Sequence, residues 1–199
     1  MDETGTADMF ADVFAAGHPR GREHLFAYRV RGLDRSAVAL WISGVNDEPD
    51  RVLALPAADR RRVPLFTTVR QARVYADRRG RKLDWPEAAT LELGRVQHWL
   101  QDPALRRVPP GAVLDAWNFF EDLARGLGEV DRLPPQGAVH NSAYERLFGG
   151  ECAAWTAAEQ RAVRELLTAG VELWNSCPAI VKPGSGGASG SGRGAPSAR

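Results

Sequence analysis

Side chains that could do chemistry are few in this chain, and none stands at the spacing of a familiar catalytic motif. Cys152 and His140 could together serve nucleophilic catalysis, with Asn141 able to orient the imidazole, but their spacing alone does not support such a pair. The sequence has no GxSxG elbow, no GxxxxGKS/T phosphate loop and no HExxH helix. We therefore expect a protein that is not an enzyme, with no catalytic residue and no cofactor.

Metal and disulfide chemistry are equally poorly supported. Cys152 and Cys177 are the only two cysteines, too few for a disulfide scaffold, and they form no CxxC pair. None of the four histidines has ligand spacing, so each is expected in the core or on the surface. We expect buried or incidental thiols and no metal site.

Carboxylates gather on one predicted helix, VLDAWNFFEDLARGLG, residues 113–128. At 100° per residue its apolar residues share one arc and predict a buried face: Val113, Ala116, Trp117, Phe120, Leu123, Ala124 and Leu127. Asp115, Asn118 and Asp122 fall on the other side, with Phe119 at its edge. This stripe is either a solvated helix face or an acidic contact surface, with an aromatic anchor, for a basic partner.

Further candidate contact residues lie in connections between the predicted elements. Acids cluster at a turn rich in Asn, Asp and Pro, residues 46–50, and Glu121 adds another on the helix. Tryptophans in connections are either lids over the core or contact anchors. The candidate partner-binding residues are Asp47, Glu48, Asp50, Trp85, Asp115, Asn118, Phe119, Glu121, Asp122 and Trp155.

Charge is distributed unevenly along the chain although the net charge is only +1. Residues 60–82 hold nine basic residues against one acid, whereas residues 84–175 hold fourteen acids against eight arginines. With Phe66 and Tyr75 interleaved, the basic segment 60–82 offers an alternative function as a nucleic-acid-binding accessory protein. The other interpretation is that the two oppositely charged regions attract each other in the fold.

The hydrophobic pattern predicts an α+β fold. Period-two alternation or apolar runs indicate three strands, residues 24–32, 37–45 and 51–56, joined by short turns into an N-terminal antiparallel meander. Thr67 or Thr68 can cap a helix that packs on this sheet. A C-terminal helical layer is expected from residues 91–103, 113–128 and 140–150, and from a long helix that begins at the capping box of Thr156 and Glu159.

Composition is that of an ordinary globular chain, with 44% hydrophobic and 26% charged residues. We expect a flexible acidic arm over residues 1–20, a single domain over residues 21–180, and a disordered Gly/Ser-rich tail over residues 181–199. No window approaches the roughly 20 apolar residues of a membrane helix, and the acidic start is unlike a secretory signal. A cytoplasmic location with no membrane contact is the expectation.

Three passages together carry a resemblance to a family: PLFTTVRQARVYADRRG, VLDAWNFFEDLARGLG and AYERLFGGECAAWTAAEQRAVRELLTAGVELW. They resemble small actinobacterial immunity-type proteins of polymorphic or contact-dependent toxin systems. The resemblance spans about two thirds of the chain and includes no catalytic residue. It implies an α+β fold, a cytoplasmic protein and neutralisation of a cognate toxin by direct binding.

Overall fold

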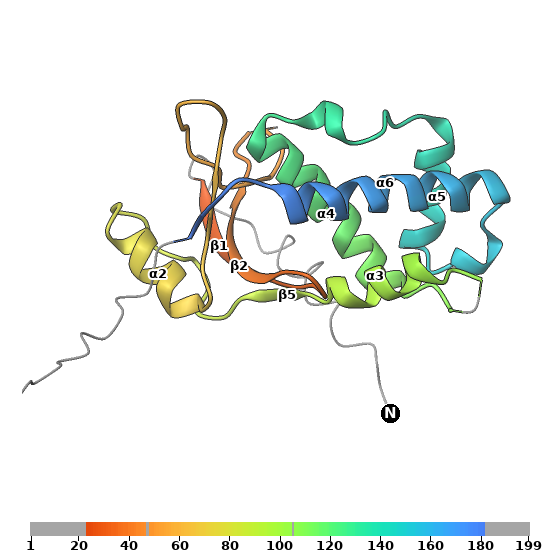
Figure 1. Ribbon diagram of the computed structural model, residues 1–199, viewed down its shortest axis with the longest axis horizontal. Helices are drawn as coiled ribbons and strands as arrows, with labels where there is room; N and C mark the ends of the chain where they lie inside the picture. Colours follow the sequence, from red (N-terminus) through yellow and green to blue (C-terminus); the bar gives the residue numbers. More distant parts are fainter. Residues whose placement is uncertain (1–22, 47, 105, 182–199) are drawn as a thin grey trace, which may run out of the picture.

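The computed structural model describes residues 23–46, 48–104 and 106–181, and these have the predicted α+β architecture. The predicted N-terminal arm, residues 1–20, lies outside the described residues, as does the predicted tail apart from Val181. Strands dominate the first part of the described chain and helices the second (Figure 1).

The main sheet contains the predicted meander. Strands β1 (His24–Arg31), β2 (Ser36–Ser43) and β3 (Arg51–Val52) are antiparallel neighbours. A fourth strand, β5 (Ala89–Leu91), adds to the free edge of β1 in parallel, which gives the order β3-β2-β1-β5. The pairing of β5 was not predicted, because three residues are too short to carry a periodic signal.

A second, smaller sheet ties the end of the described chain back to its first half. Strand β4 (Val63–Leu65) pairs in parallel with β6 (Ala179–Val181). Neither strand is among the three that the sequence predicted. The two strands are more than a hundred residues apart, so their pairing leaves no local pattern.

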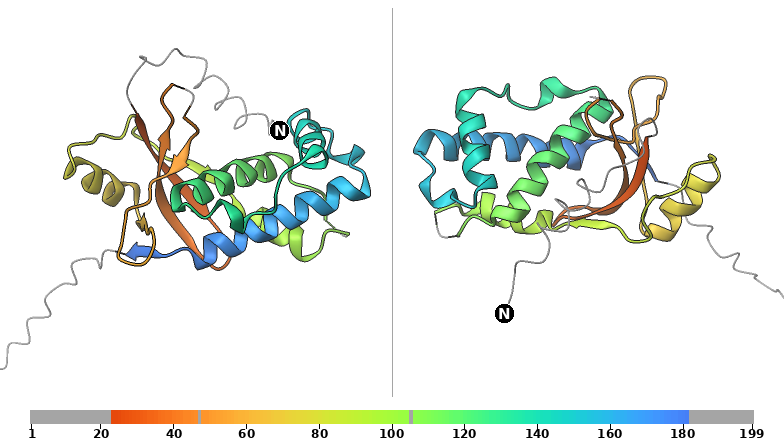
Figure 2. Two further views of the ribbon diagram at one scale, coloured as in Figure 1. Left: turned by 90° about the horizontal axis from the view of Figure 1, so that it is seen from above. Right: turned by 180° about the vertical axis from the view of Figure 1, so that it is seen from behind.

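Helices cover both faces of the main sheet. One helix stands on the outer face, and the others form a layer on the inner side, in which the helices nearest the sheet carry the rest (Figures 1 and 2). The outer helix is α2 (Val69–Asp77), and the others are α3 (Leu93–Gln101), α4 (Pro110–Leu127), α5 (Ala138–Phe148) and α6 (Ala157–Ser176). Two short 3-10 turns, η1 (Val130–Arg132) and η2 (Cys152–Ala154), connect them.

Alternation along the strands divides the core into two parts. Leu25 and Ala27 of β1 face α2, in a small cluster with Phe66 and Tyr75. Val30 faces the opposite way, into the larger cluster shared with α3 to α6. Because adjacent side chains of a strand point to opposite faces, one strand supplies both clusters.

Helix α4 occupies the centre of the larger cluster, as the apolar arc predicted. All seven residues of that arc are buried. The helix begins at Pro110, whose missing N–H costs nothing in the first turn. It ends at Gly128, which adopts a left-handed conformation with φ of 72°.

Two glycines let α4 approach its neighbours closely. A Cβ on Gly126 would lie 2.1 Å from the Val52 carbonyl oxygen, and one on Gly170 of α6 would lie 2.0 Å from the Phe120 ring. No side chain fits at either contact. These approaches hold α4 against β3 and α6, and so fix which residues of α4 remain near the surface.

Other predicted helix features are confirmed in part. Thr68 caps α2, and Thr156 and Glu159 form the predicted capping box of α6. Of the two places expected for the histidines, His98 takes the surface, and Phe148 at the end of α5 is 72% exposed. Among the described residues, no helix has the length and apolar content needed to cross a bilayer.

Candidate functional site

Partly exposed aromatic side chains line the inner face of the main sheet beside α4. Phe26 and Trp41 are cross-strand partners, with ring centroids 5.3 Å apart. Tyr28 follows Phe26 on the same face, two residues along β1. The Trp41 indole Nε1 donates a hydrogen bond to Oδ2 of Asp122, at 2.7 Å, and so joins the sheet to the acidic side of α4.

Arg125 brings the acids of the turn and of the helix together. Its guanidinium donates to the Asp50 carbonyl and to the carboxylate of Asp122, and it contacts Glu121 at 3.0 Å. The turn itself is held by the Gly44 N–H, which donates to Oδ1 of Asp50 at 2.8 Å. We call the combined surface the acidic–aromatic face: Phe26, Tyr28, Trp41, Asp50, Asp115, Glu121 and Asp122.

The carboxyl of Asp115 stands out because it lacks a partner within the described residues. No hydrogen bond or ion pair of its side chain is found within the described residues. Burial raises the pKa of Asp115 from 3.8 to about 6. A carboxylate that is desolvated without compensation costs folding free energy at neutral pH, and such groups cluster at functional sites.

The pKa values of two neighbouring groups, Asp122 and Tyr28, are raised as well. Burial also raises the pKa of Asp122 to about 6, against the opposing effect of the Trp41 hydrogen bond and of Arg125. The pKa of the Tyr28 phenol is raised by burial and then by the negative charges of Asp115 and Asp122. Tyr28 therefore stays protonated and offers an O–H donor beside these two carboxylates.

Several other predicted contact residues remain at the surface. Glu48 is exposed and pairs with Arg51 at 3.6 Å, and Asp47 lies outside the described residues. Asn118 is exposed and accepts a hydrogen bond from the Tyr144 hydroxyl at 3.1 Å. Trp85 is 38% exposed, with its ring centroid 6.4 Å from that of Phe26. Trp85 thus extends the row of aromatic side chains on the sheet.

Two of the candidate contact residues are buried in the structure and so expose little surface to a partner. Phe119 is only 3% exposed, because its ring stacks on Tyr28 and meets the edge of Trp174. Trp155 is 5% exposed, and its Nε1 donates to the Ala143 carbonyl at 3.0 Å. Trp155 is therefore a lid over the core, the other role considered for it. Asp122 is also more buried than a solvated stripe would allow, at 8%.

The basic segment 60–82 is not one surface. It divides between the loop after β3 and helix α2, and several of its arginines are engaged within the chain. Arg61 donates to the Gly126 carbonyl, Arg81 pairs with Glu23, and the Arg79 guanidinium lies 3.7 Å from the Tyr75 ring centroid. Within the described residues, no ion pair joins this segment to an acid of residues 84–175, so these contacts do not support an attraction between the two oppositely charged regions.

Cys152 and His140 show no sign of a catalytic pair. Both cysteines are free and buried, as predicted, and burial raises the pKa of the Cys152 thiol. A thiol with a raised pKa is a poor nucleophile at neutral pH. His140 Nδ1 accepts from the Gly137 N–H, and its ring meets the edge of Trp117. No group of three or more metal-ligating side chains occurs in the described part of the chain.

Sequence reasoning missed Phe26, Tyr28 and Trp41 as site residues. Their shared face was visible in the period-two alternation of the two strands. Their position beside Asp115 and Asp122 was not, because it depends on how α4 packs against the sheet. Comparison with known proteins adds no further guidance: no family model matches this chain, nor does any curated protein or solved structure.

Proposed function

We propose that this protein is a non-enzymatic protein-binding module whose acidic–aromatic face receives a basic segment of a partner. The observation that carries the proposal is the partly buried carboxyl of Asp115, which has no partner in the described part of the chain and a pKa of about 6. An arginine or lysine from a partner would supply the missing counter-charge. It would also favour the ionised form of Asp115 and so lower its pKa in the complex.

The surroundings of Asp115 support binding rather than simple solvation. Phe26, Trp41 and Trp85 provide aromatic side chains of the kind that dominates binding energy when water is excluded around them. Glu48 and Glu121 lie toward the rim, where charges chiefly raise the association rate. Aromatic anchors within an acidic rim suit a basic protein partner.

Within this class, the resemblance noted in the sequence favours an immunity protein. The partner would then be a cognate toxin, and binding would neutralise it by occluding its active site. A basic nuclease domain is the toxin type whose charge best complements this face. The proposal includes a cytoplasmic location in an actinobacterium.

The proposal is tested with the product of the neighbouring gene, co-expressed and co-purified with the full chain. Asp115→Asn should weaken the complex by about 30-fold or more, since truncating one side of a buried charge pair costs about 2–5 kcal/mol. The matched control is Asp131→Asn, an exposed acid on η1, which contacts the end of α6 through Arg132 and Ser176. The control should leave affinity within about twofold.

A loss of binding by Asp115→Asn can be assigned to the contact itself, because this substitution should not unfold the protein. Loss of binding by a variant at least as stable as the parent places the contact at Asp115. Unchanged affinity after charge reversal at Asp50, Asp115, Glu121 and Asp122 together would rule out this face as the interface. Rescue of growth against the toxin domain by the parent chain, and not by Asp115→Asn, would support the immunity role.

A further inference from the structure

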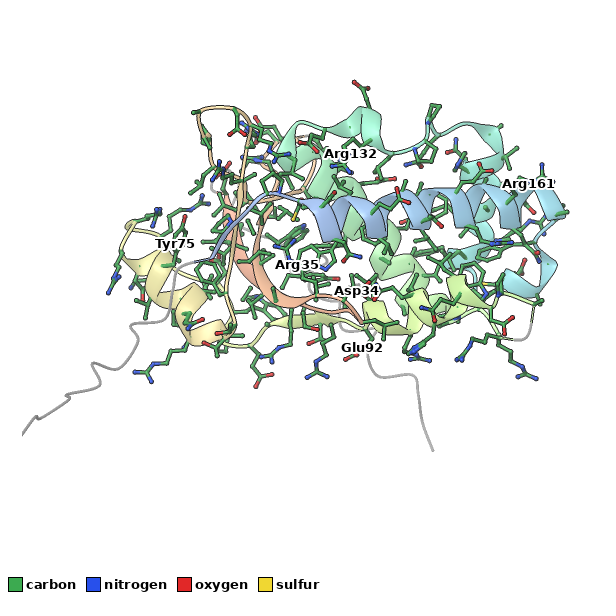
Figure 3. The ribbon with its side chains drawn as sticks, viewed as in Figure 1. Asp34, Arg35, Tyr75, Glu92, Arg132 and Arg161 are labelled. Carbon is green, nitrogen blue, oxygen red and sulfur yellow. The ribbon has the colours of Figure 1, made fainter. Side chains whose placement is uncertain are left out.

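A row of arginines follows one edge of the molecule, and all of them except Arg31 lack an ion pair or side-chain hydrogen bond within the described residues. Helix α2, strand β5 and helix α3 succeed one another along this edge, at the bottom of Figure 1 and again in the view from behind (Figure 2). Glu92, at the start of α3, marks its middle (Figure 3). Two hollows open along it, and arginines line both.

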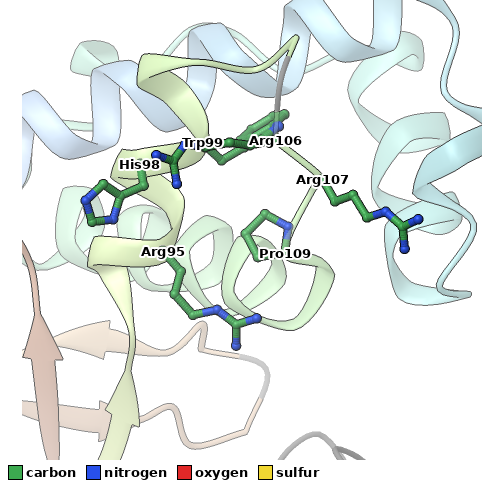
Figure 4. Close-up of a pocket in the computed structure, with 6 residues that line it drawn as sticks. All are labelled: Arg95, His98, Trp99, Arg106, Arg107 and Pro109. Carbon is green, nitrogen blue, oxygen red and sulfur yellow. The ribbon is translucent and has the colours of Figure 1, made fainter.

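The first hollow, of about 340 Å³, lies between α3 and the segment that leads to α4. Arg95 and His98 project from α3, and Arg106 and Arg107 from that segment (Figure 4). No carboxylate is among the lining residues, and none of these four side chains has an ion pair or hydrogen bond within the described residues. Unpaired guanidinium groups around a hollow are suited to an anion.

The second hollow, of about 420 Å³, lies on the outer face of the sheet between β1, β5 and the start of α2. Arg29 and Arg31 line it with Thr90 and one acid, Glu87. Arg31 forms an ion pair with Glu92, with 2.9 Å between Nη1 and Oε1, whereas the side chain of Arg29 has no such partner in the described part of the chain. Glu87 and Glu92 balance the two arginines of this hollow, so it is the weaker of the two, and its contribution to anion binding comes from Arg29.

The spacing of the hollows selects the kind of anion. Thr90 in the second and Arg95 in the first are separated by the end of β5 and the first turn of α3, on the order of 10 Å of backbone. A single phosphate cannot occupy both hollows. A polymer with regularly repeated phosphates can, and each strand of a DNA duplex presents one phosphate per roughly 3.4 Å of axis.

We propose that this basic edge, formed by Arg29, Arg31, Arg95, His98, Arg106 and Arg107, binds the phosphodiester backbone of a nucleic acid. The contacts are to phosphates, so binding is independent of base sequence. Trp99, the aromatic side chain of the first hollow, is 3% exposed and leaves no ring face on which a base could stack. No residue that lines either hollow belongs to the acidic–aromatic face.

The test uses the full chain and a fluorescein-labelled 20-base-pair DNA duplex, with binding followed by anisotropy between 50 and 200 mM salt. The double variant Arg95→Ala/Arg107→Ala removes two charges from the edge. The matched control, Arg161→Ala/Arg164→Ala, removes two exposed charges from α6, where Arg161 stands far from the edge (Figure 3). Thermal melting of both doubles checks that neither change alters the fold.

Salt-dependent binding by the parent chain is the expected result. The double variant Arg95→Ala/Arg107→Ala should bind the duplex about tenfold more weakly at 50 mM salt. The slope of log affinity against log salt concentration should become shallower by about 2, since each lost phosphate contact removes about 0.9 from it. The control variant Arg161→Ala/Arg164→Ala should keep the parent's affinity within about twofold and leave the salt slope unchanged. Arg29→Ala should also weaken duplex binding while leaving the affinity for tripolyphosphate, which fits in one hollow, unchanged.

Three outcomes would overturn the proposal. The first is that the parent chain shows no salt-dependent binding of the duplex. The second is that the two double variants lose equal affinity for the duplex, and the third is that polyglutamate binds as tightly as the duplex does. The last would assign the edge to an acidic protein. An RNA duplex run in parallel identifies which nucleic acid is preferred, and preference for either one supports the assignment.

Discussion

Trp41 and Asp122, 81 residues apart in the chain, are joined by a 2.7 Å hydrogen bond from the indole N–H to the carboxylate. This bond fastens the second strand of the sheet to the acidic side of α4. It places a partly exposed aromatic ring and a desolvated carboxyl in the same surface. The acidic–aromatic face therefore depends on a contact between two elements that are distant in sequence.

Replacing Trp41 by Phe should destabilise the protein by about 1.5–3 kcal/mol at pH 7.5, the range for a hydrogen bond to a charged group. The pKa of Asp122 is about 6, so at pH 5 the carboxyl is mostly protonated and the loss should be smaller. Urea unfolding at both pH values measures the difference. Trp85→Phe is the control, because Trp85 is 38% exposed and donates no hydrogen bond within the described residues. An equal loss at the two pH values would contradict a bond to the ionised form.

Asp115→Asn should stabilise the protein by about 1–3 kcal/mol at pH 7.5. The pKa of Asp115 is raised to about 6 from 3.8, so the folded state binds the proton more tightly than the unfolded state does. The contribution of Asp115 to stability is therefore greatest below pH 4 and is lost as the pH rises through 6. The amide does not titrate, so its advantage should vanish near pH 4. Denaturant titrations across this range measure the effect, and a variant less stable than the parent at pH 7.5 would show that Asp115 has a partner within the fold.

Gly170→Ala should destabilise the protein by about 1–3 kcal/mol or more, because its new Cβ would collide with the Phe120 ring. The matched change is Gly111→Ala in α4, where a Cβ meets nothing within 4 Å. Alanine has the higher helix propensity, so this change should be neutral or stabilising by up to about 1 kcal/mol. Thermal unfolding distinguishes the two. Equal melting temperatures for the two variants would mean that α4 and α6 can separate without cost.

Thr156→Ala should cost about 1 kcal/mol by removing the side-chain cap of α6. Its capping-box partner, Glu159, accepts hydrogen bonds from Ser142 and the Thr156 N–H, which lower the pKa of Glu159 from 4.5 to about 2. Ionised Glu159 therefore stabilises the folded state, and this contribution to stability is complete above pH 4.5 and is lost as the pH falls toward 2. Thr168→Ala, at an exposed position within the same helix, serves as the control. Acid titration of Glu159→Gln should show a flatter fall in stability over this range than the parent chain does.

Much of the fold followed from local patterns. The alternation in β1, the apolar arc of α4 and the capping box of α6 depend on residues within a few positions of one another, and each predicted its element. The short strands β5 and β6 could not be predicted from local patterns, because each contains three residues and pairs with a strand far away in the chain. Their parallel pairing depends on the path of the chain between them.

The candidate site was predictable only in part for the same reason. A helix covered on one side keeps its polar stripe in solvent, and that assumption placed Phe119 and Asp122 at the surface. Helix α4 is covered by β3 and α6 together, so both residues are buried. The sequence could indicate that acids share one side of α4, but it could not indicate what faces them.

By itself the sequence determined the α+β class, the central role of α4 and the uneven charge, since periodicity and composition are local properties. Only the tertiary structure decided that Asp50 and Asp122 meet at Arg125, and that Asp115 has no partner within the described residues. The physical reason is that burial and the pairing of charges depend on distances through space, which packing sets and chain order does not.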